Sequence, residues 1–236
     1  SPAERAALQE ALRASRPANP FGPDSLTRVL AVASGKGGVG KSTVTVNLAA
    51  ALASQGRSVG IVDADVHGFS VPGLLGITQA PTKLEDMILP PVVEVPHRTR
   101  EDPSAGSVRV ISIGMFVDGN RPIAWRGPML HRALEQFLTD VHFGDLDVLL
   151  LDLPPGTGDI AISMAQLLPT ARLLLVSTPQ QAAVEVAERA GTLSLQTGQE
   201  VIGVVENMAA MLLPDGSTME LFGAGGGQRL AGRLTE

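Results

Sequence analysis

The sequence predicts a doubly wound α/β fold built on a mostly parallel sheet, and two observations support this prediction. Short runs of Val, Ile and Leu, such as VLAVA at 29–33 and VLLLD at 148–152, alternate with longer helical stretches. Continuous apolar runs are typical of strands buried on both faces, and helices between them are typical of parallel crossovers. A glycine-rich loop also follows the first run and precedes a helical stretch, which is the order of a strand, a P-loop and a helix.

Each element is assigned from its composition and its place in this alternation. The strands are expected at 28–34, 58–63, 108–114, 147–152, 172–178 and 201–207. The helices are expected at 42–55, 129–141, 159–168 and 182–196. Residues 80–107 carry five prolines among charged residues and predict a peripheral excursion, because proline is poorly suited to a central strand. Two apolar segments flank PDGS between 211 and 222 and predict a hairpin.

The chain is expected to divide into three parts. Residues 1–15 consist largely of helix formers and predict an appended N-terminal helix. Residues 16–27 contain three prolines and predict a linker. Residues 28–236 predict the P-loop domain, and its C-terminal part is expected to be truncated, because the chain stops inside a helix that we expect to open at Gln228.

Composition argues against several classes of partner. The formal net charge of −6 is hard to reconcile with a broad basic face for nucleic acid or anionic membranes, although a small local patch stays possible. Aromatic residues make up 3% of the chain, too few for a platform on which bases stack. No apolar run approaches 18 residues and the N-terminus lacks a signal-peptide core. We therefore expect a cytoplasmic protein that binds neither nucleic acid nor membranes.

The absence of cysteine excludes several kinds of site. With no Cys, this chain alone cannot form disulfides, zinc fingers or Cys-ligated iron–sulfur clusters. The four histidines show no HxxxH or HxH spacing, so we expect solvated or core histidines, with a metal site assembled only in three dimensions as the alternative. They are His67, His97, His131 and His142.

The glycine-rich loop SGKGGVGKST fits the P-loop pattern from Gly35 to Ser42. Its glycines let backbone N–H groups approach and surround phosphate oxygens at a helix N-terminus. Lys41 is expected to reach the β- and γ-phosphates, and the Ser42 hydroxyl is expected to ligate Mg²⁺. We therefore predict ATP and Mg²⁺ as ligands, with a purely structural turn as the alternative. The predicted nucleotide-binding residues of the loop are Gly35, Lys36, Gly37, Gly38, Val39, Gly40, Lys41, Ser42 and Thr43.

Lys36 and three aspartates extend this prediction. A second lysine is not needed to cradle phosphate within one subunit, so Lys36 is expected either to act on a partner or to be solvated. Asp63, Asp65 and Asp152 follow strand ends, where a doubly wound sheet binds ligands, although such residues also cap helices. Because alternate residues of a strand point the same way, the first two carboxylates are expected to face the phosphate crevice. The predicted metal ligands are Ser42, Asp63 and Asp152, and the predicted catalytic residues are Lys36, Lys41 and Asp65, the last orienting the attacking water.

The segments SGKGGVGKST, DADVHG, WRGPM, DLPPGTGD, VENM and FGAGGG together resemble the signatures of the Mrp family of ATP-dependent iron–sulfur cluster carriers. That family belongs to the deviant Walker A ATPases, with MinD and ParA. The resemblance implies that Lys36 reaches across a nucleotide-sandwich homodimer and that Asp152 is the Walker B carboxylate. It also implies that Asp63 and Asp65 form switch I and that Asn207 contacts the adenine. An asparagine at a strand end could equally satisfy backbone groups there.

The chain departs from this family at one motif. Members usually carry Cys-Pro-x-Cys-Gly shortly after the VENM segment, and its cysteines hold a cluster between two subunits. The corresponding stretch here is Leu-Pro-Asp-Gly-Ser at 213–217, which retains a hairpin pattern without either ligand. An iron–sulfur cluster is therefore implied by the resemblance only, and we expect that this chain by itself holds no stable cluster.

The leading hypothesis is a homodimeric, Mg²⁺-dependent ATPase whose closure serves the binding of iron–sulfur clusters and their transfer to apoproteins. Its partners would be iron–sulfur client or assembly proteins, as the resemblance implies. The alternative is a spatial regulator like MinD or ParA, in which ATP-driven dimerisation toggles membrane or DNA binding. A basic amphipathic C-terminal helix or a basic dimer face would favour that alternative. A third class, electron-transfer reductases, requires cluster thiolates.

Overall fold

The computed structural model describes residues 20–66, 68–85, 87–96, 106–116, 127–156 and 159–235. Within these ranges the chain forms a seven-stranded sheet in the order β5-β6-β2-β7-β1-β8-β9. All neighbouring strands pair in parallel except β5 and β6, which are antiparallel. The predicted helix at 1–15 lies outside the described residues, as do residues 16–19 of the predicted linker.

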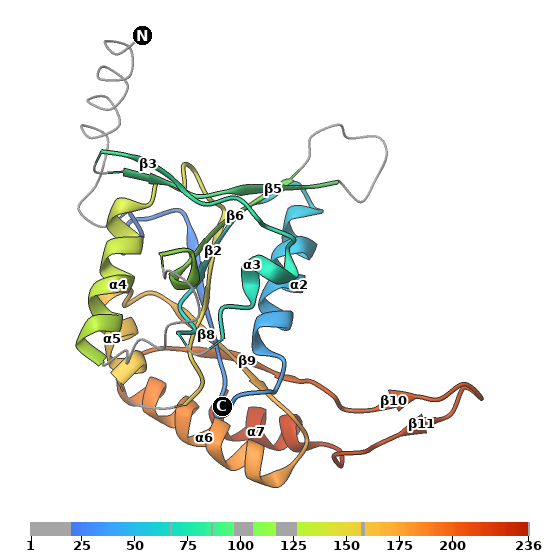
Figure 1. Cartoon of the computed structure of the whole chain (residues 1–236). Coiled ribbons are helices and arrows are strands. Elements are labelled where there is room, and N and C mark those ends of the chain that lie inside the picture. The colour runs from blue at the N-terminus through green and yellow to red at the C-terminus, as the bar shows by residue number, and fades with distance from the viewer. Residues whose placement is uncertain are drawn as a thin grey trace.

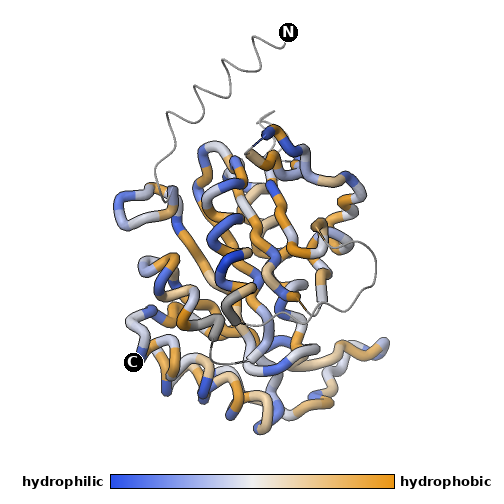
Figure 2. The backbone as a smooth tube through the Cα atoms, turned by 60° about the vertical axis from the view of Figure 1, so that its left-hand side comes forward, coloured by the Kyte–Doolittle hydropathy of each residue, from blue (hydrophilic) through white to orange (hydrophobic). Residues whose placement is uncertain are grey.

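The strands of this sheet other than β5 coincide closely with the predicted apolar runs. Their bounds are β1 Arg28–Ala33, β2 Ser58–Asp63, β5 Val92–Val95, β6 Gly106–Ser112, β7 Val148–Asp152, β8 Arg172–Ser177 and β9 Val201–Glu206. In Figure 2 the strands are largely coloured as hydrophobic, as expected for strands covered on both faces. The mostly parallel, doubly wound sheet predicted from the sequence is therefore confirmed.

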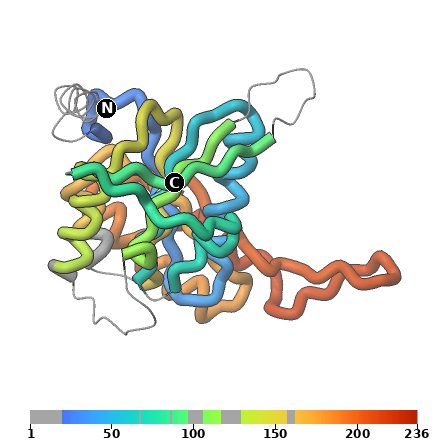
Figure 3. Tube along the Cα trace, turned by 45° about the horizontal axis from the view of Figure 1, so that its top comes forward, coloured from blue at the N-terminus to red at the C-terminus, as the bar shows by residue number. Residues whose placement is uncertain are grey.

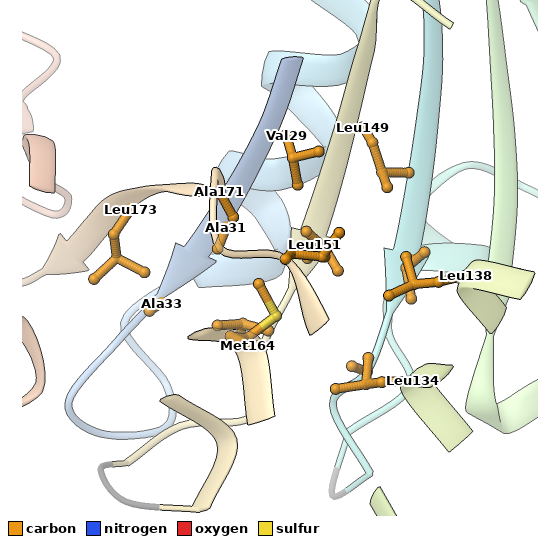
Figure 4. Close-up of a cluster of buried hydrophobic side chains, with 14 of the residues drawn as sticks. Val29, Ala31, Ala33, Leu134, Leu138, Leu149, Leu151, Met164, Ala171 and Leu173 are labelled. Carbon is orange, nitrogen blue, oxygen red and sulfur yellow. The ribbon is translucent and has the colours of Figure 1, made fainter. Parts of the chain in front are cut away.

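Helices cover both faces of the sheet (Figure 1). Their bounds are α2 Lys41–Ala53, α3 Val71–Leu74, α4 Gly127–Asp140, α5 Asp159–Leu167, α6 Gln181–Gln196 and α7 Gly226–Leu234. A short 3-10 helix, η1, spans Ile113–Phe116. Apolar residues of α2 and α3 form one core cluster with the sheet, and those of α4, α5, α6 and α7 form a second on the opposite face. Figure 4 shows part of the second cluster, where Leu134, Leu138 and Met164 meet Leu149 and Leu151 of the central strand.

Two regions differ in detail from the sequence prediction. Within the proline-rich segment, the described residues form a small hairpin, β3 (Thr82–Leu84) and β4 (Met87–Leu89), followed by the edge strand β5. The segment is peripheral as expected, but strands were not predicted there; β5 is compatible with its flanking prolines because it has only one neighbour, β6. The last helix, α7, begins at Gly226, two residues before the predicted start.

Candidate functional site

The phosphate loop connects β1 to α2 at the carboxyl edge of the sheet. Gly38 and Gly40 adopt left-handed backbone conformations, with φ of 77° and 85°, which side chains other than glycine rarely tolerate. Gly40 is the N-cap residue of α2, so the helix N-terminus faces into the loop. A cavity of about 580 Å³ lies here, within the size range of ligand sites. It is lined by Ser34, 36–43, Asp65, 68–70 and Pro155.

Two neighbouring segments hold the loop in place. A Cβ atom on Gly35 would lie 2.4 Å from backbone atoms of Val186 and Ala187, so the loop packs directly on α6. The Asn207 side-chain amide, at the end of β9, donates to the carbonyl oxygen of Val39 over 2.9 Å. This is the backbone-satisfying role that the sequence allowed for Asn207, and its contact with adenine stays a prediction.

Lys41 is the central cation of the site. Its side chain is only 5% exposed, and its Nζ lies 2.8 Å from Oδ1 of Asp152 and 3.3 Å from Oδ2 of Asp65. The buried Asp152 also accepts hydrogen bonds from the Ser42 and Thr45 hydroxyls, over 2.5 Å and 3.0 Å. Burial strengthens these charge interactions relative to the surface. The sequence analysis missed Thr45, whose signal is a hydroxyl one helical turn after Lys41 on the buried side of α2.

Asp63 and Asp65 have different environments although they are two residues apart. Asp65 lines the cavity, whereas Asp63 is fully buried and is not among the lining residues. Asp63 accepts hydrogen bonds from the Ser112 hydroxyl and from the backbone N–H of Asp65. Burial, and then the negative charge of Asp152, raise the pKa of Asp63 to about 7. Its assignment as a metal ligand stays a prediction. Ser112 is a further residue that the sequence analysis missed.

The residues present fit Mg²⁺ in one respect. The Ser42 hydroxyl and the Asp152 carboxylate lie side by side and are hard oxygen donors, which Mg²⁺ prefers. In the part of the chain that the structure describes, no three His, Asp or Glu side chains are grouped as a metal site. Mg²⁺ at nucleotide sites is usually held by one or two protein groups together with substrate phosphates and waters. His67 and His97 lie outside the described residues.

Lys36 lines the same cavity, but its ammonium group is directed elsewhere. Its Nζ donates to Oε1 of Gln180 over 2.9 Å, and the Ser34 hydroxyl donates to the Lys36 carbonyl over 3.1 Å. Gln180 immediately precedes α6, the helix on which Gly35 packs. Gln180 was not predicted as a site residue, because 144 positions separate it from Lys36 in the sequence.

A hairpin arm, residues 208–222, projects away from the body of the molecule (Figure 3). Its strands β10 (Met211–Leu212) and β11 (Thr218–Met219) are antiparallel, and Asp215 closes the turn by accepting from the backbone N–H and hydroxyl of Ser217. Those two hydrogen bonds hold the pKa of Asp215 below its usual value. The arm exposes the apolar side chains of Met208, Met211, Leu212, Met219, Leu221 and Phe222. The predicted hairpin is thus present, and its turn offers Leu213 and Gly216 at the positions where a cluster site would need thiolates.

Comparison with known sequences gives consistent matches. The family model for the NUBPL iron-transfer P-loop NTPase, of the ParA group, matches residues 25–235. An iron-sulfur cluster carrier protein from Mycobacterium tuberculosis is 61% identical over 235 residues, covering 98% of this chain and 58% of the relative. The protein of the same name from Bacillus subtilis is 48% identical over 206 residues, covering 87% of this chain and 55% of the relative. The chain therefore spans somewhat more than half the length of these relatives.

Solved structures agree with this result. A nucleotide-binding protein from Archaeoglobus fulgidus in complex with ADP is 37% identical, with a TM-score of 0.70, and the match covers 89% of this chain and 79% of that protein. MinD from Pyrococcus horikoshii with Mg-ADP is 24% identical, with a TM-score of 0.51, and the match covers 77% of this chain and 70% of that one. The second match supports the fold alone. None of the helices in the described ranges has the length and apolar character needed to cross a membrane.

Proposed function

The chain belongs to the ParA-type family of iron-transfer P-loop NTPases, and on that premise we propose that it is a Mg²⁺-dependent ATPase that works as a homodimer. One observation supports this proposal most: Lys41 is buried against two carboxylates and lines a cavity of about 580 Å³. In phosphoryl transfer, positioning and charge neutralisation account for most of the catalysis. This cluster supplies both.

Each group has a role in that reaction. The N–H groups of the loop bind the phosphates, and Lys41 exchanges its contact with Asp65 for one with the β- and γ-phosphate oxygens. Ser42 and Asp152 would hold Mg²⁺, which neutralises phosphate charge when bound. Asp65, which lines the cavity, orients the water that attacks the γ-phosphorus. Asp63 helps to position Asp65 by accepting a hydrogen bond from the Asp65 backbone N–H.

The cargo implied by the relatives' name is an iron–sulfur cluster, which is a substrate of the carrier. The groups on the arm do not fit it, because the chain contains no cysteine and thioether sulfur is a poor replacement for thiolate. We therefore place ATP hydrolysis in this chain and the cluster ligands in a client, a partner or a segment beyond these 236 residues. Closure of the ATP-bound dimer then serves loading or transfer to apoproteins.

Substitution of Lys36 tests whether the protein hydrolyses ATP as a dimer. Acting across the interface, it is expected to stabilise transferring phosphate as an arginine finger does, so Lys36→Ala should bind ATP normally but hydrolyse it about 10³-fold more slowly. The wild-type rate per subunit should rise with protein concentration. Lys83→Ala is the matched control, because Lys83 lies over the Phe116 ring in a region outside the nucleotide cavity.

Two outcomes would contradict this proposal. One is a wild-type rate in Lys36→Ala together with a rate per subunit that does not depend on concentration. The other is ATP-dependent co-sedimentation with lipid vesicles or DNA, which would indicate the spatial regulator.

A further inference from the structure

We propose that Gln180 is a positioning residue that holds Lys36 inside its own subunit until the ATP-bound dimer closes. This inference rests on the proposed function, in which Lys36 acts across the dimer. The contact itself, 2.9 Å between Lys36 Nζ and Gln180 Oε1, lies within one subunit. Lys36 therefore has to leave Gln180 before it can reach a partner.

Both ends of this contact are fixed by the surrounding backbone. On one side, Gly35 packs against α6 and the Ser34 hydroxyl binds the Lys36 carbonyl. On the other side, the Gln180 carbonyl accepts from the N–H groups of Ala183 and Val184, in the first turn of α6. The distance that the two side chains bridge is thus set by the fold, so the contact is preorganised.

The Gln180 side chain has no competing structural role in its helix. Gln180 occupies the N-cap position of α6, yet its side chain makes no capping hydrogen bond. Its oxygen accepts from Lys36, with a second, longer contact of 3.5 Å from the Thr178 hydroxyl. Because Gln180 is neutral, its hydrogen bond with Lys36 is weaker than an ion pair and can be released when phosphate charge approaches.

The contact between Lys36 and Gln180 should favour separated subunits over the closed dimer. The free energy needed to break the contact is subtracted from the free energy of dimer closure, and it is subtracted twice because each subunit contributes one contact. Removing the acceptor should therefore favour closure, and replacing it with a carboxylate should oppose closure. These opposite directions separate a positioning role from general damage, which would move both variants the same way.

The first experiment measures the acylation rate of the Lys36 amine in the nucleotide-free monomer. The chain contains three lysines, so acylation by an N-hydroxysuccinimide ester can be followed at each by peptide mass spectrometry, with Lys83 as internal reference. Gln180→Leu should raise the acylation rate of Lys36 several-fold. The matched control is Gln181→Leu, the adjacent glutamine, which contacts Glu185 on the exposed side of α6 and should leave the rate unchanged. Equal Lys36 rates in wild type and Gln180→Leu would overturn the proposal.

The second experiment measures ATP-dependent self-association by sedimentation velocity across a protein dilution series. A hydrogen bond to a charged group supports a factor of about ten per contact. With two contacts per dimer, the midpoint concentration should fall by about 10²-fold in Gln180→Leu, and it should rise in Gln180→Glu. The hydrolysis rate at saturating protein should stay within about twofold of wild type in Gln180→Leu. Midpoints that are unchanged, or that move in the same direction in both variants, would overturn the proposal. A wild type that never associates, with the acylation result intact, would instead contradict the proposed dimer.

Discussion

The phosphate loop and the hairpin arm differ in the kind of side chain they carry and in how deeply those side chains are buried. In the loop, Lys41 is 5% exposed and contacts two carboxylates, and glycines bring the backbone against α6 and Asn207. In the arm, Leu212 is 73% exposed and its neighbours are apolar side chains around a polar turn. The family match extends over both regions, but only the first has the clustered charged groups that the proposed reaction needs. A match across a whole chain therefore does not establish each function separately.

The largest expected effect is at Lys41. Lys41→Ala removes the cation proposed to bind the β- and γ-phosphates, and it leaves Asp152 and Asp65 without this positive partner. We expect affinity for Mg·ATP to fall by about 10³-fold or more, because the lost charge interaction lies in a site shielded from water. Calorimetric titration measures it, and Lys36→Ala, which should bind normally, is the control. Unchanged affinity in Lys41→Ala would remove the assignment of the loop as a nucleotide site.

The two carboxylates that contact Lys41 should differ in their effects. Asp65→Asn should slow hydrolysis by about 10²-fold with little change in binding, because we propose that Asp65 orients the attacking water. Asp152→Asn should raise the Mg²⁺ concentration needed for half-maximal activity, because Asp152 lies against the Ser42 hydroxyl. Titrating Mg²⁺ at saturating ATP separates the two. The same rate loss and the same metal dependence in both variants would show that this division of roles is wrong.

Alanine substitutions at two glycines with nearly the same φ, one in the loop and one in the arm, compare how tightly the two regions are packed. Gly40 and Gly216 have φ of 85° and 83°, but a Cβ on Gly40 would lie 2.2 Å from Nδ2 of Asn207, whereas a Cβ on Gly216 meets nothing within 4 Å. Gly216→Ala should cost about 1 kcal/mol of unfolding free energy from strain alone. Gly40→Ala should cost about 2–4 kcal/mol, since the clash adds to the strain, and should also weaken nucleotide binding. Urea unfolding of both variants measures this difference. Equal losses would indicate that Asn207 moves aside freely.

Spacing along the sequence was sufficient to predict the loop and the strand ends, because both depend on local pattern. The sheet register then brings Asp63 of β2 directly opposite Asp152 of β7, as the positions of the strand ends suggested. Strand alternation predicted that Asp63 and Asp65 face the same crevice, but only Asp65 lines the cavity. The alternation does not apply to this pair, because β2 ends at Asp63 and the backbone beyond it is no longer a strand. Ser112 and Gln180 could not be predicted either, because each contacts the site only through tertiary packing between segments distant in sequence.

The central claim is that this chain retains the nucleotide site and lacks the means to hold a cluster. Anaerobic reconstitution with iron and sulfide, followed by desalting, iron analysis and an ATPase assay on the same sample, tests it most directly. A double variant, Leu213→Cys with Gly216→Cys, restores thiolates to the turn and serves as the positive control. We expect near-zero iron with intact ATP hydrolysis in the wild type, and bound iron in the double variant. Stoichiometric iron per dimer in the wild type, with a visible charge-transfer band, would contradict the claim.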